Sequence, residues 1–190
     1  MSTAVVPIGF ESGVVWLDDQ EQHEVTLPNA SASLPKDVWL VWWSAFADIE
    51  SAAAHNLSRD RLAEVSAKLG VDSPQEHITT LYENGLLADL DMGKPEAFFR
   101  SHKLYPLADG FGEVAKNSGK FQIAREGKAL LEVNLDVYAV WCMSVYDSSL
   151  WGTVTKYAEG VNAAPEDVAE AIAQALPAIV ANRCGFLQSA

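Results

Sequence analysis

Two apolar, aromatic-rich runs of similar sequence occur far apart in the chain. One covers residues 37–46 and opens with Asp37-Val38, and the other covers residues 136–145 and opens with Asp136-Val137. Apolar positions this dense over about ten residues are typical of a helix that is buried on most of its sides. The matched openings indicate an internal repeat, which predicts similar elements on either side of each run.

Short β-type stretches precede each run. Residues 14–17 and 24–27 are rich in Val, Trp, Thr and Leu and are separated by acidic, polar residues. In the second half, residues 121–124 and 130–133 flank the turn-like pair Glu126-Gly127. Strand-forming residues on both sides of a polar or glycine-containing turn predict a β-hairpin in each half.

Two further helices are expected after each run. Ser58 is a candidate N-cap with a stop at Gly70, and residues 73–76, Ser-Pro-Gln-Glu, have the pattern of a capping box. In the second half, Ser149 opens a helix that is expected to end at Gly160. A last, longer helix is expected from residue 165 to Gly185, kinked or split at the proline at position 177.

The same order of elements in both halves predicts a duplication. The expected fold class is α+β, mostly helical, with two tandem winged-helix-like modules packed together, each a β-hairpin followed by three helices. Residues 1–90 form the first module and residues 120–190 the second. Residues 91–119 fit neither pattern and are too aromatic for a solvated linker. They are expected to form an ordered connecting segment that packs across both modules.

Charge and composition narrow the classes of function. The net charge is −13, with 13 Lys and Arg against 26 Asp and Glu, and such a field repels nucleic acid. No apolar run reaches the roughly 18 residues of a membrane span, and no basic segment precedes an apolar stretch near Met1 as in a secretory signal. Two cysteines make no disulfide framework. We therefore expect a cytoplasmic protein that binds neither nucleic acid nor membrane.

Motifs of known chemistry are missing from the sequence. No two histidines are four residues apart, no nucleophile elbow or dinucleotide fingerprint occurs, and the pair Gly110 and Gly112 lacks the following helix of a phosphate loop. Paired acids such as Asp18-Asp19 are explained by a turn. We therefore expect no catalytic residues, no metal site and no cofactor.

Tryptophans concentrate in the first apolar run. Trp39, Trp42 and Trp43 fall at positions i, i+3 and i+4, on one side of a helix, and Trp141 matches Trp42 in the other run. A small module has little interior room for three indoles, each of which can bury about 150–250 Å². At least two are expected in the core, and one at an interface. The candidate partner interface comprises the aromatic residues Trp39, Trp43, Phe98, Phe99, Tyr105 and Phe111.

The second half resembles a known family. From Leu131-Glu132-Val133-Asn134-Leu135-Asp136 through Trp141 to Gly185-Phe186-Leu187, its apolar pattern is similar to that of the PqqD-like peptide chaperones. These are also called RiPP precursor-peptide recognition elements. The resemblance covers about 70 residues, from Lys120 to Ala190, and extends more loosely over the first half. In this sequence the family's module is expected to occur as a tandem pair, without an attached enzyme domain.

The resemblance implies a function. Members of the family bind the leader segment of a ribosomally made precursor peptide, which adds as a strand to the hairpin and lies beside the last helix. It implies a groove lined by Leu130, Leu131, Glu132, Val133, Val168, Ile172 and Ala175. A second groove is implied between residues 24–27 and helix 75–84. The protein would be a non-catalytic accessory subunit whose partners are a precursor peptide and a separate modifying enzyme, with a metalloenzyme as one option.

Three alternatives stay open at this point. An acidic tandem winged-helix scaffold subunit of a larger assembly would use its aromatic surfaces to bind a partner protein. A winged-helix transcriptional regulator would need a local basic face, for which only a small cluster around Arg100, His102 and Lys103 is available. An enzyme of a kind without a recognised motif is the third.

Overall fold

The computed structural model describes residues 3–47, 49–54 and 56–190 and has an α+β fold, as expected. The first half contains β1 (Thr3–Pro7), β2 (Phe10–Leu17), β3 (Gln20–Leu27), β4 (Ala30–Pro35), α1 (Lys36–Ala47), α2 (Ile49–Ala53), α3 (Arg59–Lys68), α4 (Pro74–Glu83) and β5 (Leu87–Asp91). The second half contains α5 (Glu96–Ser101), β6 (His102–Pro106), β7 (Asp109–Glu113), β8 (Phe121–Arg125), β9 (Lys128–Val133), α6 (Leu135–Met143), the 3-10 turn η1 (Ser144–Tyr146), α7 (Leu150–Val161), α8 (Pro165–Ala181) and β10 (Gly185–Ser189).

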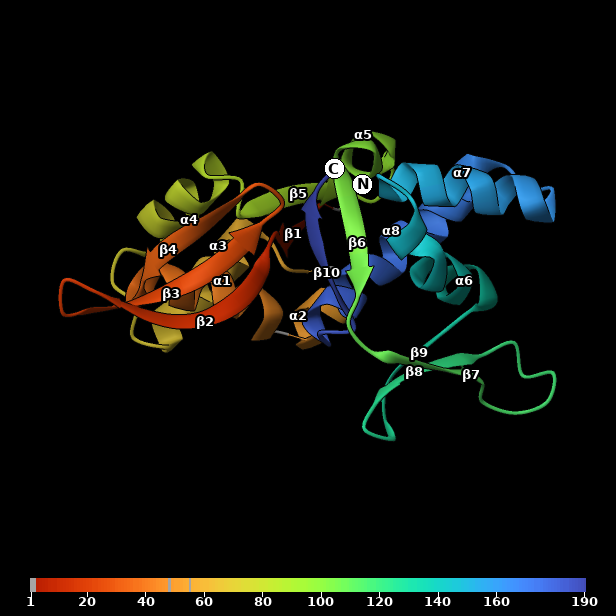
Figure 1. Cartoon of the computed structure of the whole chain (residues 1–190), viewed down its shortest axis with the longest axis horizontal. Helices are drawn as coiled ribbons and strands as arrows, with labels where there is room; N and C mark the ends of the chain where they lie inside the picture. The colour runs from red at the N-terminus through yellow and green to blue at the C-terminus, as the bar shows by residue number, and fades with distance from the viewer. Residues whose placement is uncertain (1–2, 48, 55) are drawn as a thin grey trace.

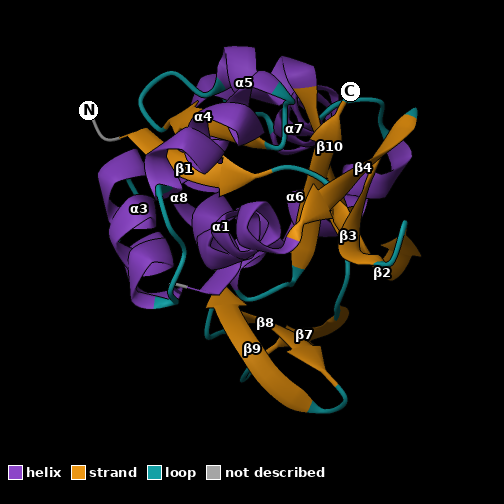
Figure 2. Ribbon diagram, turned by 90° about the vertical axis from the view of Figure 1, so that its left-hand side faces the viewer, coloured by secondary structure: helices purple, strands orange, loops and turns teal. Residues whose placement is uncertain are grey.

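Both halves have the same strand topology. In each, a leading strand is followed by a three-stranded antiparallel sheet, then by helices, and a final strand returns to pair with the leading strand. The three-stranded sheets have the orders β2-β3-β4 and β7-β8-β9, and the two-stranded ribbons are β1-β5 and β6-β10. Figure 1 shows the two three-stranded sheets projecting from the body at different places, and Figure 2 shows β7, β8 and β9 standing below the rest.

Small irregularities also recur in both halves. A β-bulge interrupts the first strand of each three-stranded sheet, next to Gly13 in β2 and next to Gly112 in β7. At the end of the last helix, the side-chain Nδ2 of Asn84 and of Asn182 donates to the carbonyl four residues earlier, at 2.8 Å in each case. Matching bulges and caps at matching places indicate that the halves are two versions of one structural unit.

The expected hairpins are incomplete. In the first half the expected hairpin, residues 14–17 and 24–27, lies in β2 and β3, the first two strands of its sheet. In the second half it lies in β8 and β9, the last two strands of the other sheet, so the two expected hairpins are not equivalent. The strands β4 and β7 were not expected. Residues 91–119 contain β6 and β7, which are integral to the second unit. Ala-Ser-Ala-Ser-Leu-Pro in β4 has low strand propensity and becomes a strand only because β3 pairs with it.

Helix boundaries agree with the sequence in part. The hydroxyls of Ser58 and Ser149 accept from the backbone N–H three residues later, both at 3.2 Å, which confirms these two N-caps. The expected capping box at Ser73 is wrong, because Ser73 is left-handed (φ 49°) and its side chain caps nothing. Helix α7 continues past Gly160 to Val161, where Asn162 ends it at a φ of 55°.

The last helix also differs from expectation. Helix α8 is one helix over Pro165–Ala181 and includes the expected break point Pro177. It ends ahead of Gly185, with Asn182 as its C-cap and Arg183 at a φ of 52°. Gly185 instead begins β10, since pairing with β6 takes the chain into an extended conformation.

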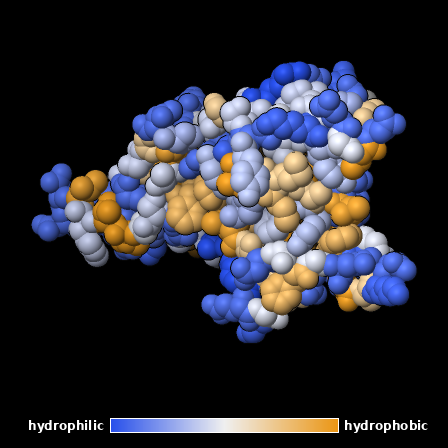
Figure 3. All heavy atoms as spheres, turned by 45° about the vertical axis from the view of Figure 1, so that its right-hand side comes forward, coloured by the Kyte–Doolittle hydropathy of each residue, from blue (hydrophilic) through white to orange (hydrophobic). Residues whose placement is uncertain are grey.

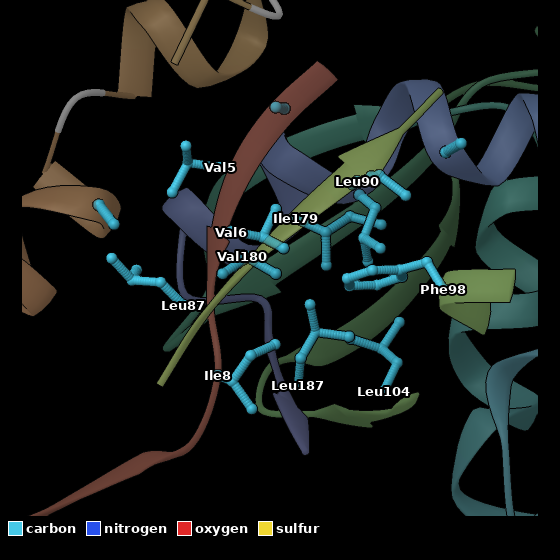
Figure 4. Packing of buried hydrophobic residues seen from close by; sticks show 14 of the residues in the cluster. Val5, Val6, Ile8, Leu87, Leu90, Phe98, Leu104, Ile179, Val180 and Leu187 are labelled. Atoms are coloured by element: carbon cyan, nitrogen blue, oxygen red, sulfur yellow. The ribbon is translucent and has the colours of Figure 1, made fainter. Parts of the chain in front are cut away.

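One hydrophobic core serves both halves. Side chains of β1 and β5 meet those of β6, β10 and α8 between the two ribbons, as Figure 4 shows for Val6, Leu90, Ile179, Leu104 and Leu187. Helix α8 packs against α2 of the first half as well as against α6 and α7. Each fully buried aliphatic side chain contributes about 1.5–3 kcal/mol. The units are therefore stabilised by each other as well as internally.

No helix in the described part of the chain is both long and apolar enough to span a bilayer. The relation of each unit to the winged-helix fold stays a prediction, because the shared α+β architecture alone does not define that fold.

Candidate functional site

The strand β9 lies at the edge of its sheet. It pairs with β8 on one side, and no strand in the described residues pairs with its other side. The ladder is irregular here: Ala124 lies opposite Ala129 and Ile123 opposite Leu131, so Leu130 between them has no cross-strand partner. A bulge of this kind changes the direction in which a side chain points and is often found next to binding sites.

A cleft of about 350 Å³ opens beside Leu130. Its walls come from the end of α1, the start of α2, the end of α8 and the β8–β9 hairpin, so both halves of the chain contribute. The lining residues are Trp43, Phe46, Ala47, Ile49, Arg125, Leu130, Ala181, Asn182 and Arg183. Most of these side chains are apolar, which suits an apolar side chain of a ligand.

Two arginines border the cleft. The guanidinium of Arg183 lies 5.7 Å from the ring centroids of both Trp43 and Phe46, within cation–π range, and its Nη2 is 3.9 Å from a carboxylate oxygen of Glu11. Arg125 donates through Nη2 to the backbone carbonyl oxygens of Leu107 (3.3 Å) and Arg183. Arg125 therefore joins its sheet to the end of α8 and fixes the shape of the cleft, while Arg183 keeps a partly exposed positive charge at its rim.

The expected peptide-binding residues separate into two groups. On β9, Leu130, Leu131 and Val133 are half-buried and Glu132 is exposed, as suits an edge strand. On α8, Val168 and Ile172 are 4% and 1% exposed and belong to the core, and Ala175 is half-buried.

The expected groove is therefore misplaced along α8. The amino-terminal half of this helix faces the interior, because its apolar stripe packs on α6 and α7. The cleft beside β9 lies instead at the carboxyl-terminal end of α8, where α1 and α2 of the first half complete it.

The second expected groove is contradicted. Residues 24–27 lie in β3, which is the central strand of its sheet and pairs with β2 on one side and β4 on the other. A strand whose two edges are both paired has no free backbone groups to offer a peptide. The free edges of this sheet belong to β2 and β4.

The expected interface aromatics do not form one surface. Phe98 and Phe99 are 7% and 0% exposed and belong to the common core. Tyr105 is half-buried and stacks on Phe186 of β10, with ring centroids 5.1 Å apart. Phe111 on β7 is 56% exposed. Of this set, only Trp43 lines the cleft beside β9.

Trp39 takes part in a different arrangement. It is half-buried and stacks on the ring of His23, with centroids 3.9 Å apart and planes inclined by 11°. The indole N–H of Trp39 and both ring nitrogens of His23 are buried without a hydrogen-bond partner among the described residues. The nearest carboxylate oxygen, on Glu21, is 3.6 Å from Nε2 of His23. This stack joins α1 to β3.

A second cleft, of about 540 Å³, lies between α5 and the start of α8. Its charged groups are paired or dispersed: Arg100 forms an ion pair with Glu96 at 2.8 Å and lies 5.1 Å from the ring centroid of Trp151. Glu166 and Asp167 occupy the first turn of α8, where carboxylates favour the helix dipole. Nothing in this arrangement forms a nucleophile–base pair.

Groups with shifted pKa values are scattered through the fold. Burial raises the pKa of the Cys184 thiol to about 11 and, with a hydrogen bond to Asp136, that of Tyr157 to about 12. Burial lowers the pKa of His102. The described residues hold no group of three or more His, Cys, Asp or Glu that could bind a metal ion.

Sequence reasoning missed seven residues of the cleft beside β9: Phe46, Ala47, Ile49, Arg125, Ala181, Asn182 and Arg183. They gave no local signal, because they come from segments that meet only in the folded chain. Searches of protein-family models, curated proteins and solved structures give no match to this chain. The edge of β9 and the cleft beside it are therefore the features of the molecule that point to a function.

Proposed function

We propose that this protein is a non-catalytic, cytoplasmic peptide-binding subunit. It recognises the leader segment of a ribosomally made precursor peptide and presents that peptide to a separate modifying enzyme. In this proposal the leader adds as a fourth strand to the free edge of β9.

The observation that carries the proposal is the combination of a free strand edge with an apolar cleft directly beside it. An added strand gains backbone hydrogen bonds from the edge, and alternate side chains gain specificity from the pocket. Leu130 connects the two, since it belongs to β9 and lines the cleft. The peptide would place an apolar side chain between Leu130 and Trp43.

The arrangement of the site also favours an accessory role. The cleft is built from α1, α2, α8 and the β8–β9 hairpin, so a bound peptide would contact both units of the tandem. A peptide strand that pairs with β9 through one of its edges leaves its other edge, and every second side chain, exposed to a second protein. Such a complex suits delivery to an enzyme.

The test uses overlapping synthetic peptides that cover the short proteins encoded beside this gene. Each is titrated into the isotope-labelled full chain, and the backbone amide shifts are followed by NMR. A leader peptide is expected to shift amides of β9 and of the end of α8. The proposal is wrong if every peptide fails to bind, or if the peptides that bind leave β9 unaffected.

A matched pair of variants separates the cleft from general charge effects. Leu130→Asp puts a carboxylate into the apolar cleft and is expected to weaken peptide binding at least tenfold. Ser31→Asp adds the same charge to an exposed site on β4, the edge strand at the corresponding place in the first sheet, and is expected to leave binding unchanged. Equal effects of the two variants would argue against the cleft.

A further inference from the structure

A free strand edge is also present in the first half of the chain, on β2. It pairs with β3, and no other strand in the described residues pairs with it. Beyond the bulge at Gly13, the pairing is regular to Leu17, which faces Gln20 across the two-residue turn of Asp18 and Asp19. In a two-residue hairpin the pair next to the turn is hydrogen-bonded and the pairs alternate from there. By this alternation, the backbone groups of Val14 and Trp16 point away from β3.

This edge is unusually apolar and unprotected. Trp16 is 70% exposed, Leu17 51%, Val14 49% and Phe10 41%. Figure 3 shows apolar surface beside hydrophilic residues on the part of the molecule that projects to the left, where Figure 1 places β2 and β3. Proteins usually protect such edges with Lys or Pro. Residues 8–27 contain neither.

The charge of this sheet is one-sided. Carboxylates occur at Glu11, Asp18, Asp19, Glu21 and Glu24, and the first Lys or Arg of the chain is Lys36. The corresponding stretch of the second unit holds several cations, namely Lys103, Lys116, Lys120, Arg125 and Lys128. The two sheets share a topology but present different electrostatic fields, so the two edges suit different ligands.

We propose that the outer edge of β2 is a docking surface for a basic, extended segment of a partner protein. The segment adds as a strand beside residues 13–17, with apolar side chains against Val14 and Trp16 and with Lys or Arg side chains near the carboxylates of the hairpin. Pairing with a second copy of this chain is disfavoured, because it would bring two acidic sheets together. The inference goes beyond the peptide-binding role at β9 and uses a different edge, so either can fail alone.

The test uses a short, end-capped peptide of alternating Lys and Val. Two control peptides accompany it: one has Glu in place of Lys, and the other has a central Pro, which removes a backbone donor. Binding to the full chain is measured by NMR shifts of the amides of residues 13–17. We expect binding of the Lys–Val peptide, weakened as salt is added, and at least tenfold weaker binding of both controls. Equal binding of all three peptides, or shifts confined to other surfaces, would overturn the proposal.

Variants locate the effect on β2. Trp16→Thr is expected to weaken binding of the Lys–Val peptide at least fivefold, whereas Phe111→Thr, which removes an exposed aromatic ring from β7, is expected to leave it unchanged. Both side chains are mostly exposed, so both variants are expected to fold. Sedimentation of the wild-type protein tests for a dimer. A dimer that Trp16→Thr abolishes would show that the edge of β2 binds a second copy of this chain, and the proposal of a basic partner segment would then be wrong.

A charge variant tests the electrostatic part. Asp18→Asn with Asp19→Gly removes two carboxylates, and Asn-Gly is favoured where both turn residues have positive φ, as here (49° and 62°). We expect at least threefold weaker binding without loss of stability. Glu126→Asn in the β8–β9 turn, which also has a positive φ at this position (51°), is the control and is expected to leave affinity unchanged. An unchanged affinity of the Asp18/Asp19 variant would refute charge complementarity as the basis of docking.

Discussion

Replacing Trp42 by Phe tests how much one buried hydrogen bond stabilises the shared core. Trp42 is 1% exposed, and its indole Nε1 donates to the Ile8 carbonyl at 3.0 Å, with no other donor to that oxygen found among the described residues. Phe leaves the carbonyl buried without a donor, which costs about 1–3 kcal/mol. The lost part of the ring adds about 1 kcal/mol of packing. We expect Trp42→Phe to lower the free energy of unfolding by about 2–4 kcal/mol.

Two other tryptophans give a graded comparison. Trp141 donates to the Cys184 carbonyl at 3.0 Å, but this oxygen also accepts from Leu107 N at 2.9 Å and keeps that donor in Trp141→Phe. We expect a loss of about 1–2 kcal/mol there. The indole N–H of Trp39 has no hydrogen-bond partner among the described residues, so Trp39→Phe is expected to cost less than about 1 kcal/mol.

The measurement is urea unfolding of each variant by circular dichroism, with the midpoint and the m-value fitted together. The expected order of destabilisation is Trp42→Phe, then Trp141→Phe, then Trp39→Phe, at unchanged m-values. Equal losses for Trp42→Phe and Trp39→Phe would show that ring size, and not hydrogen bonding, sets the cost. That result would refute the reasoning.

Three further predictions concern stability. Ser58→Ala and Ser149→Ala are each expected to cost about 1 kcal/mol in urea unfolding, and Ser73→Ala no more than a few tenths; equal losses would contradict the assignment of the caps. His23→Phe is expected to raise the free energy of unfolding by about 1 kcal/mol, since it keeps the aromatic stack and removes two buried nitrogens that have no hydrogen-bond partner in the described part of the chain; a loss of stability would mean that these nitrogens are hydrogen-bonded. Burial raises the pKa of Cys184 in the folded state to about 11, against the ordinary 9.0, so the free energy of unfolding falls as the pH rises from about 9 to 11. Cys184→Ala is expected to make this fall smaller in urea unfolding curves measured at each pH.

Local signals in the sequence predicted much of the helical structure. The run beginning at Asp37 and its partner at Asp136 became α1 and α6, because the density of apolar residues in each needs no distant partner to favour a helix. Ser58 and Ser149 act within a few residues, so their caps could also be predicted. The capping box at Ser73 failed, because the backbone there takes a left-handed conformation that no local pattern indicated.

The strands and the candidate site depended on tertiary structure. The pairing of β1 with β5 and of β6 with β10 joins segments separated by almost a whole unit, and β4 has a composition that no propensity would assign to a strand. The cleft beside β9 exists because Trp43, Leu130 and Arg183 meet there. The sequence alone determined the composition, the net charge and the helices with their serine caps, because each of these depends on the residue types or on residues close together in the chain. Strand edges, burial and clefts arise from contacts between distant residues, and only the folded chain decided which apolar side chains became core and which stayed available to a ligand.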